Sequence, residues 1–321
     1  MRRSAERAVG WTRAGLVVCL ILAGCAGPLP ARSDRPDPQA DFDARCHAPG
    51  VVRCIGFDSA RETDPYLHPP WGERQKRARI DTDVKASGAG SLRFEVPSNS
   101  GNDTSGSFQM NFADDLSVQF GEGDEFFVQW RQRFSREFLS TYYGGGYGWK
   151  QVVVGEGDRP GYGAPGCTQL ELVVTNTDQL GFPQMYHSCG GKDGMYEPLG
   201  GGAGYVANEW MTFTIRIKIG TWYRNDGHYH RDSTVQLWVA REGQPGKLAV
   251  NLSPEPMSLF GIRIPGTGSG YDLANENPAA RYGKVLLTPY HTGKDPAQRH
   301  PTGYVWYDEL IVATSRIPDP R

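Results

Sequence analysis

The sequence lacks the features that identify several large classes of protein. It has no strong charge of either sign, because 34 lysines and arginines nearly balance 36 aspartates and glutamates, for a net charge of −2. No overall electrostatic field therefore attracts nucleic acid or a membrane surface. Heptads, internal repeats and long segments of helical periodicity are also missing, which excludes coiled coils, repeat proteins and helical bundles.

Common catalytic motifs are missing as well. The chain has no Gly-x-Ser-x-Gly nucleophile elbow and no His-Glu-x-x-His zinc motif. The glycine-rich stretch 200–204 lacks the Lys-Ser/Thr pair of a phosphate-binding loop. His228 and His230 form a His-x-His pair, but no third zinc ligand is evident. The usual nucleophile and metal-dependent hydrolases are therefore not expected.

The longest apolar run lies near the N-terminus. Residues 1–13 contain four arginines and one acid, and the ten apolar residues 14–23 follow, too few to span a bilayer. This arrangement is typical of a signal peptide, and Leu22-Ala23-Gly24-Cys25 resembles the bacterial lipobox. The resemblance implies removal of residues 1–24 and lipidation of Cys25; the alternative is an ordinary signal peptide that contains a cysteine. We expect an exported lipoprotein at the outer membrane, periplasm or cell surface, attached to the membrane through its lipid alone.

The next segment, residues 25–45, is rich in proline and polar residues and predicts a flexible tether. Residues 46–321 would then form one domain. It contains four cysteines, Cys46, Cys54, Cys167 and Cys189. An even number in an exported chain predicts two disulfides with three possible pairings. We favour Cys46–Cys54 and Cys167–Cys189, because each closes a short loop; free buried thiols are the alternative, which an oxidising compartment disfavours.

Eleven short segments of this domain are rich in β-branched and aromatic residues and are flanked by turn residues. They are 51–57, 91–96, 107–112, 125–134, 150–154, 169–175, 184–188, 211–219, 234–240, 284–290 and 304–312. Many strands with almost no helix predict an all-β fold, a β-sandwich of two packed antiparallel sheets.

Several strands alternate between apolar and polar side chains, so one face of each is expected in the core. In 125–134 and 211–219 the polar face is long and cationic. It carries Gln129, Arg131, Arg133, Arg216 and Lys218. Such a face either points to water or lines a groove for an anionic or hydroxyl-rich ligand.

The C-terminal half also carries a recognisable series of motifs. They are a Glu-Trp pair before strand 211–219, Val-x-Leu-Trp-Val at 235–239, a strand that ends in Tyr290, and a closing Tyr-x-Asp-x-x-x-Val strand. Together they resemble the concanavalin-like jelly rolls of polysaccharide lyases of the alginate, glucuronan and heparin type. The resemblance covers about residues 120–315 and implies a jelly roll that binds an anionic polysaccharide.

Those lyases remove the proton beside a uronic carboxylate, which needs a cation or amide for the carboxylate and a Tyr or His to move the proton. The resemblance implies catalytic roles for Arg131, Gln151 and Tyr290, and His187 and His291 are further candidate bases; the alternatives are that His187 only packs beside a disulfide and that Tyr290 only caps its strand. Arg131 or Arg133 with Gln151 would neutralise the carboxylate, and Tyr290 with His187 or His291 would move the proton. Val153 and Leu286 stand at the family's histidine and lysine positions. Expected substrate-binding residues are Gln129, Arg133, Arg216, Lys218, Lys284 and Lys294.

Two further expectations concern a metal and an alternative activity. Domains of this type often hold a structural Ca²⁺, for which Asp58 and Asp308 are the matching carboxylates. Hydrolases on the same fold use a Glu-x-Asp-x-x-Glu strand, and residues 122–127 and 156–161 both lack the final glutamate, so a glycosidase is not expected.

Two functions remain open. One is a polysaccharide lyase, a carbon–oxygen lyase that acts by β-elimination; the other is a non-catalytic carbohydrate-binding or structural lipoprotein of the cell envelope. Only the lyase requires Tyr290 to lie close to a second proton-transfer group and to a carboxylate-neutralising group.

Overall fold

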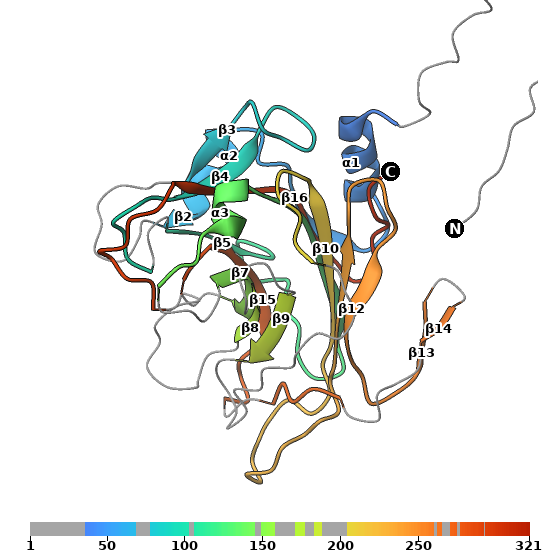
Figure 1. The fold of residues 1–321 in the computed structure, drawn as a ribbon. Coiled ribbons are helices and arrows are strands. Elements are labelled where there is room, and N and C mark those ends of the chain that lie inside the picture. The colour runs from blue at the N-terminus through green and yellow to red at the C-terminus, as the bar shows by residue number, and fades with distance from the viewer. Residues whose placement is uncertain are drawn as a thin grey trace, which may run out of the picture. The chain divides into compact units, whose positions relative to one another are not determined.

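The fold is a β-sandwich of two antiparallel sheets, seen in a computed structural model (Figure 1). The structure describes residues 36–68, 78–102, 106–144, 149–157, 171–176, 183–187, 204–259, 262–264, 270–274, 277–291 and 293–321. Cys25, Cys167 and Cys189 lie outside these residues, as does the signal segment. Within them, none of the helices has the length and hydropathy of a membrane-spanning segment.

The larger sheet has eight strands in the order β12-β11-β10-β6-β16-β4-β3, with β1 added beside β16. Their bounds are β1 Val51–Ile55, β3 Arg79–Asp81, β4 Ser91–Val96, β6 Glu125–Phe134, β10 Met211–Lys218, β11 Thr234–Ala240, β12 Lys247–Leu252 and β16 Gly303–Ala313. The central strands β10, β6 and β16 pair with their neighbours over most of their length, so the middle of this sheet is continuous.

The smaller sheet has six strands in the order β2-β5-β15-β7-β8-β9. Their bounds are β2 Leu67–His68, β5 Ser107–Asn111, β7 Trp149–Glu156, β8 Glu171–Asn176, β9 Pro183–His187 and β15 Tyr282–Leu287. A separate hairpin joins β13 Met257–Leu259 to β14 Ile262–Ile264, and the short helices α2 Ala60–Thr63, η1 Asp64–Tyr66 and α3 Arg136–Ser140 connect strands.

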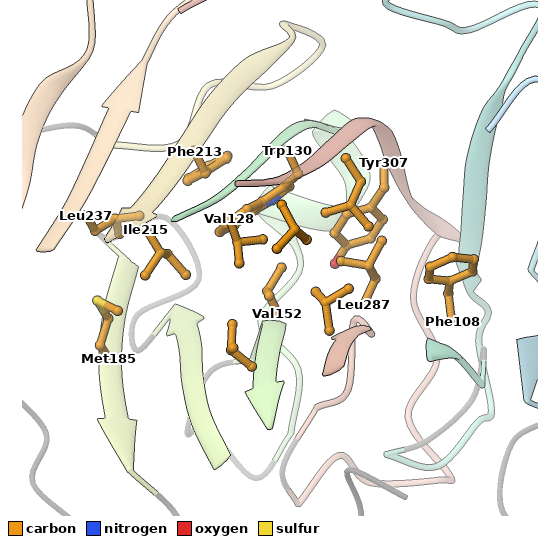
Figure 2. Close-up of a cluster of buried hydrophobic side chains, with 14 of the residues drawn as sticks. Phe108, Val128, Trp130, Val152, Met185, Phe213, Ile215, Leu237, Leu287 and Tyr307 are labelled. Carbon is orange, nitrogen blue, oxygen red and sulfur yellow. The ribbon is translucent and has the colours of Figure 1, made fainter. Parts of the chain in front are cut away.

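The hydrophobic core fills the space between the two sheets (Figure 2). Trp130 of β6 stacks on Phe213 of β10, with 5.3 Å between the ring centres. Val152 and Met185 approach them from the smaller sheet. Burial of this much apolar side chain is the main favourable contribution to folding.

All eleven predicted strands are present, which confirms the all-β fold class. Strands β2, β3, β12, β13 and β14 and the helices were not predicted. Except for β12, these strands have only two or three residues, too few positions for alternation to be detected.

The structure corrects the C-terminal end of the predicted tether, because residues 38–46 form helix α1 (Pro38–Cys46). The Asp37 side chain caps the helix by accepting a hydrogen bond from the Ala40 amide at 3.0 Å, and Pro38 occupies the first turn. Phe42 of α1 packs on Ile311 of β16, which fixes the helix to the sheet. An Asp-Pro pair before the helix was the available sequence signal.

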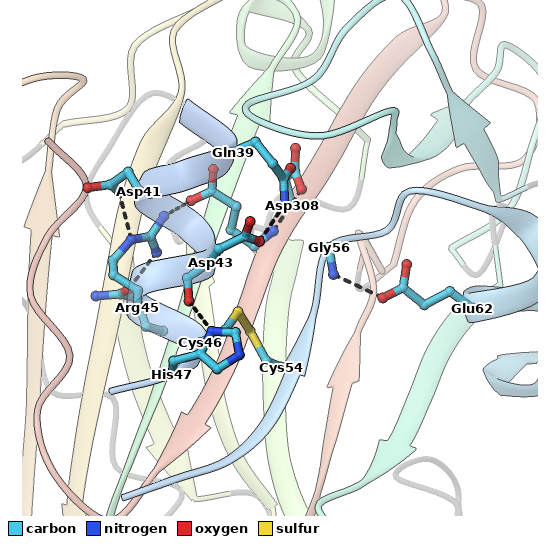
Figure 3. Close-up of a disulfide and its surroundings, with 12 residues drawn as sticks. Gln39, Asp41, Asp43, Arg45, Cys46, His47, Cys54, Gly56, Glu62 and Asp308 are labelled. Atoms are coloured by element: carbon cyan, nitrogen blue, oxygen red, sulfur yellow. Dashed lines mark hydrogen bonds and ion pairs between the residues drawn. A yellow bond between two sulfur atoms is a disulfide. The ribbon is translucent and has the colours of Figure 1, made fainter. Parts of the chain in front are cut away.

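The disulfide Cys46–Cys54 confirms one of the two favoured pairings (Figure 3). It joins the last residue of α1 to β1, with 5.7 Å between the two Cα atoms. The helix therefore lies against the larger sheet on the side away from β7 and β15 (Figure 1).

Candidate functional site

The outward face of the smaller sheet is set by a β-bulge in β7. Lys150 pairs with Thr175 of β8, and after a shift in register Val152 pairs with Val174. Gln151 and Val152 therefore both turn toward the core, and Lys150 turns outward. Without the bulge, alternation from the buried Val152 and Val154 would place Gln151 outward and Lys150 inside.

Tyr290 lies beside Lys150 at this end of the sheet. The backbone N–H of Lys150 donates to the Tyr290 carbonyl at 2.8 Å, which continues the pairing of β15 and β7. The Lys150 ammonium nitrogen is 5.4 Å from the centre of the Tyr290 ring, and the Asn102 side-chain amide donates to the Tyr290 hydroxyl at 2.8 Å. A phenol, an ammonium and a carboxamide thus meet at one partly exposed position.

Gln151 does not share this outward face. Its side chain is fully buried, donates to the Gln132 side-chain oxygen at 3.0 Å and accepts a hydrogen bond from the Tyr205 hydroxyl. The Trp130 indole N–H also donates to Gln132, at 3.0 Å. The Gln151 side chain thus uses both its donor and its acceptor on residues of the core, so it has no geometry for neutralising a bound carboxylate.

His291 follows Tyr290, but its ring is buried rather than directed at the candidate site. The ring packs 4.1 Å from that of Tyr143 and 5.4 Å from that of Phe138. Burial, together with the nearby Lys294 charge, lowers the pKa of His291 to about 3. The imidazole is therefore neutral at ordinary pH and is a poor base for the predicted proton transfer.

His291 also makes the stability of the fold sensitive to acid. Because its pKa is lower in the folded chain than in the unfolded one, protonation favours unfolding as pH falls from 6.5 toward 3, by about 1.4 kcal/mol per pH unit within that window. We expect the His291→Phe variant to lose less stability over this range, measured as the urea midpoint at each pH. The matched control is His47→Phe, a change of the same kind at an exposed position. An identical profile for His291→Phe and the unmodified chain would contradict the assignment.

Two lysines and one histidine of the predicted site have different surroundings. Lys294 is buried, and its ammonium donates to the backbone carbonyl and the hydroxyl of Ser100. Lys284 is buried on β15, opposite Asn111 of β5 and Gly155 of β7, with its neighbour Val285 in the core. His187 ends β9 opposite Leu172.

The predicted cationic face lies on the outer side of the larger sheet, not beside Tyr290. Arg131 contacts Glu309 at 3.4 Å and Glu242 at 3.5 Å, and its guanidinium lies 5.9 Å from the Trp210 ring. Arg216 pairs with Glu125 at 2.8 Å. These residues are neutralised within the chain instead of facing an anionic ligand.

Helix α1 and the C-terminal segment cover part of this face. Arg45 donates to the Gln129 side chain at 3.0 Å and pairs with Glu309, while Gln129 donates to the Pro318 carbonyl at 3.2 Å. Arg133 shares the face and Lys218 is exposed at the end of β10. Since packed sheets stand about 10 Å apart, the arginines of this face and Tyr290 cannot act on one sugar carboxylate, and the structure does not bring them together.

The two carboxylates predicted to bind calcium hold the loop before β4. Asp308 is buried and accepts backbone N–H groups from Ala86 at 2.7 Å and Ser87 at 3.4 Å. Asp58 accepts N–H groups from Ala89 and Gly90. The described part of the chain contains no cluster of three or more acidic, His or Cys side chains suited to a metal ion. Burial raises the pKa of Asp308 well above its usual range.

No protein-family model matches the chain, and no curated protein matches its sequence. Its fold is similar to that of an alginate lyase. The marine PL-14 alginate lyase from Aplysia kurodai aligns with a TM-score of 0.54 over 83% of this chain and 99% of that one, at 13% identity. The match confirms the jelly-roll fold and, at this identity, shows the fold alone.

Two other solved structures align less closely. An endo-β-1,4-glucuronan lyase from the fungus Trichoderma reesei has a TM-score of 0.49 at 13% identity, covering 83% of this chain and 96% of that one. An alginate lyase from Chlorella virus has a TM-score of 0.45 at 13% identity, covering 74% and 89%.

Sequence reasoning missed two residues of the candidate site, Lys150 and Asn102. Lys150 opens a predicted strand, but its outward direction depends on the bulge that follows it. Asn102 lies in a loop far from Tyr290 in the sequence, and only the folded chain brings its amide to the phenol. No local pattern marks either one.

Proposed function

We propose that the protein is a polysaccharide lyase that cleaves an acidic glycan by β-elimination on the outward face of the smaller sheet. The observation that carries the proposal is the group formed by Lys150, Tyr290 and Asn102. It supplies the three chemical functions that β-elimination needs, namely a cation, a hydrogen-bond donor and a phenol that can transfer a proton.

Each residue has a distinct role in the proposed reaction. The Lys150 ammonium neutralises the uronate carboxylate, which makes the adjacent C5 proton more acidic. With Tyr290 ionised, the Asn102 amide donates to its oxygen and the Lys150 ammonium lies over its ring, so that the oxygen can accept the C5 proton. The electron pair of the broken C–H bond forms the C4–C5 double bond, the C4–O bond breaks, and the leaving oxygen takes the proton from Tyr290. The products are an unsaturated uronate and a new chain end.

The fold shared with an alginate lyase supports the proposal by analogy, since function on a fold depends on the site. The placement of the group also supports it. Lys150 lies on β7 and Tyr290 three residues after β15, and a backbone hydrogen bond between them holds the two residues side by side.

The proposal is tested by the ultraviolet absorbance of the unsaturated uronate, followed while the purified chain is incubated with alginate, glucuronan, heparin, hyaluronan or pectate. We expect absorbance to rise with one uronate polymer, without added calcium, and not with a neutral glucan used as control. A flat trace with every polymer, together with measurable binding of one of them, would instead identify a non-catalytic carbohydrate-binding protein.

We also propose that the chain is an exported lipoprotein, on the strength of the basic, apolar and small-residue segment before Cys25. Cells that express the chain and are fed labelled palmitate should yield labelled protein in the membrane fraction. The Cys25→Ser variant should carry no label, whereas Cys19→Ser, within the apolar run, should be labelled like the unmodified chain. Equal labelling of Cys25→Ser would contradict lipidation at Cys25.

A further inference from the structure

Two loop segments are held together behind the candidate site. The Asn99 amide donates to the Gln298 carbonyl at 2.8 Å, and the His291 amide donates to the Asn102 carbonyl at 3.0 Å. These contacts connect the two ends of the 97–102 loop region to the segment after β15. The loop carries Asn102, whose side chain reaches the Tyr290 hydroxyl.

Lys294 contacts the loop between these two backbone hydrogen bonds. Its side chain is 4% exposed, and its ammonium donates to the Ser100 carbonyl and, at 3.2 Å, to the Ser100 hydroxyl. The Ser100 hydroxyl in turn donates to the Pro97 carbonyl at 2.5 Å. One buried cation thus binds the middle of the loop, two residues before Asn102.

A buried ammonium is costly to maintain, because burial removes its hydration. That burial lowers the pKa of Lys294, while the charge of its neighbour Asp295 opposes the effect. The described contacts of the ammonium are to neutral oxygens of a loop, not to a buried carboxylate. An apolar side chain of the same length could fill this space at less cost, which points to a role in fixing the loop.

We propose that Lys294 is a positioning residue that holds the 97–102 loop so that the Asn102 amide stays on the Tyr290 hydroxyl. The inference rests on the proposed lyase function for its effect on rate, but the contact itself can be measured without any substrate. It also assigns Lys294 a role other than the predicted substrate binding, since its ammonium is directed at Ser100.

The effect on rate is tested with a double-mutant cycle between Lys294→Met and Asn102→Ala on the cleaved polymer. If Lys294 acts through Asn102, each single variant should lower kcat by about tenfold with KM little changed, and the double variant should be no slower than Asn102→Ala alone. The control Lys247→Met, at the exposed start of β12, should keep full activity. If kcat of the double variant fell by the product of the two single effects, the residues would act independently and the proposal would be overturned.

The position of the amide is tested separately by NMR of the ¹⁵N-labelled chain. The Asn102 side-chain amide signal, identified by its loss in Asn102→Ala, should move to the chemical shift of a solvent-exposed amide both in Tyr290→Phe and in Lys294→Met. A signal that moves in Tyr290→Phe and stays in place in Lys294→Met would overturn the positioning role, whether or not any polymer is cleaved. Ser100→Ala, which keeps the carbonyl contact, should give a smaller shift and remains informative if Lys294→Met folds poorly.

Discussion

The Tyr290→Phe variant is expected to lose about a hundredfold to ten-thousandfold in kcat/KM on the cleaved glycan, the range typical of a lost proton-transfer group. The substitution removes only the hydroxyl. This group accepts the hydrogen bond from the Asn102 amide and is the only part of the side chain that can take up a proton. The ring itself remains beside Lys150, so binding of the polymer should change little and most of the loss should fall on kcat.

The stability of this variant should stay close to that of the unmodified chain. Tyr290 is only partly buried, and Asn102 is exposed, so water can replace the lost hydrogen bond. Urea unfolding checks this point. The matched control is Tyr223→Phe, an exposed tyrosine in the loop after β10, which should retain full activity. If Tyr290→Phe were as active as the control, proton transfer would have to be assigned to another group of this face.

The fold could be predicted well from the sequence because the strands are strongly periodic. In β10 apolar residues alternate with polar ones over all eight positions, and in β6 over a shorter stretch; one set does enter the core, as Trp130 and Phe213 do. Alternation depends only on the pleat of the strand, so it requires no knowledge of distant residues.

The candidate site could be predicted only in part, and the reasons are physical. Alternation shows which side chains share a face, but not what covers that face, and the cationic side of β6 proved to lie partly under α1. A bulge of one residue reversed the orientation of Lys150 and Gln151. Tyr290 was predicted from its place near the end of a strand, whereas its partner Asn102 depends on a loop contact across 188 residues of sequence.

The cationic face has a structural role that can be tested through Glu309. This glutamate is fully buried and accepts contacts from two arginines, Arg45 of α1 and Arg131 of β6, each with little exposure. Glu309→Gln would remove the buried carboxylate that both guanidinium groups share, leaving Arg45 paired with Asp41 and Arg131 with the more exposed Glu242. Because breaking a buried ion pair by changing one partner typically costs about 3–5 kcal/mol, we expect a loss of that order in the free energy of unfolding.

Urea unfolding at constant pH measures this loss. The matched control is Asp114→Asn, whose carboxylate is 60% exposed and lies 3.4 Å from Arg53, so its effect should stay within about 0.5 kcal/mol. Glu309 and Tyr290 lie on opposite sides of the sandwich, so folded Glu309→Gln, assayed well below its unfolding temperature, should keep its kcat/KM. A lower kcat/KM in the folded variant would return Arg131 to the substrate site and place the reaction on the larger sheet. Lower stability with unchanged kcat/KM would instead mean that Arg45 and Arg131 hold α1 in place.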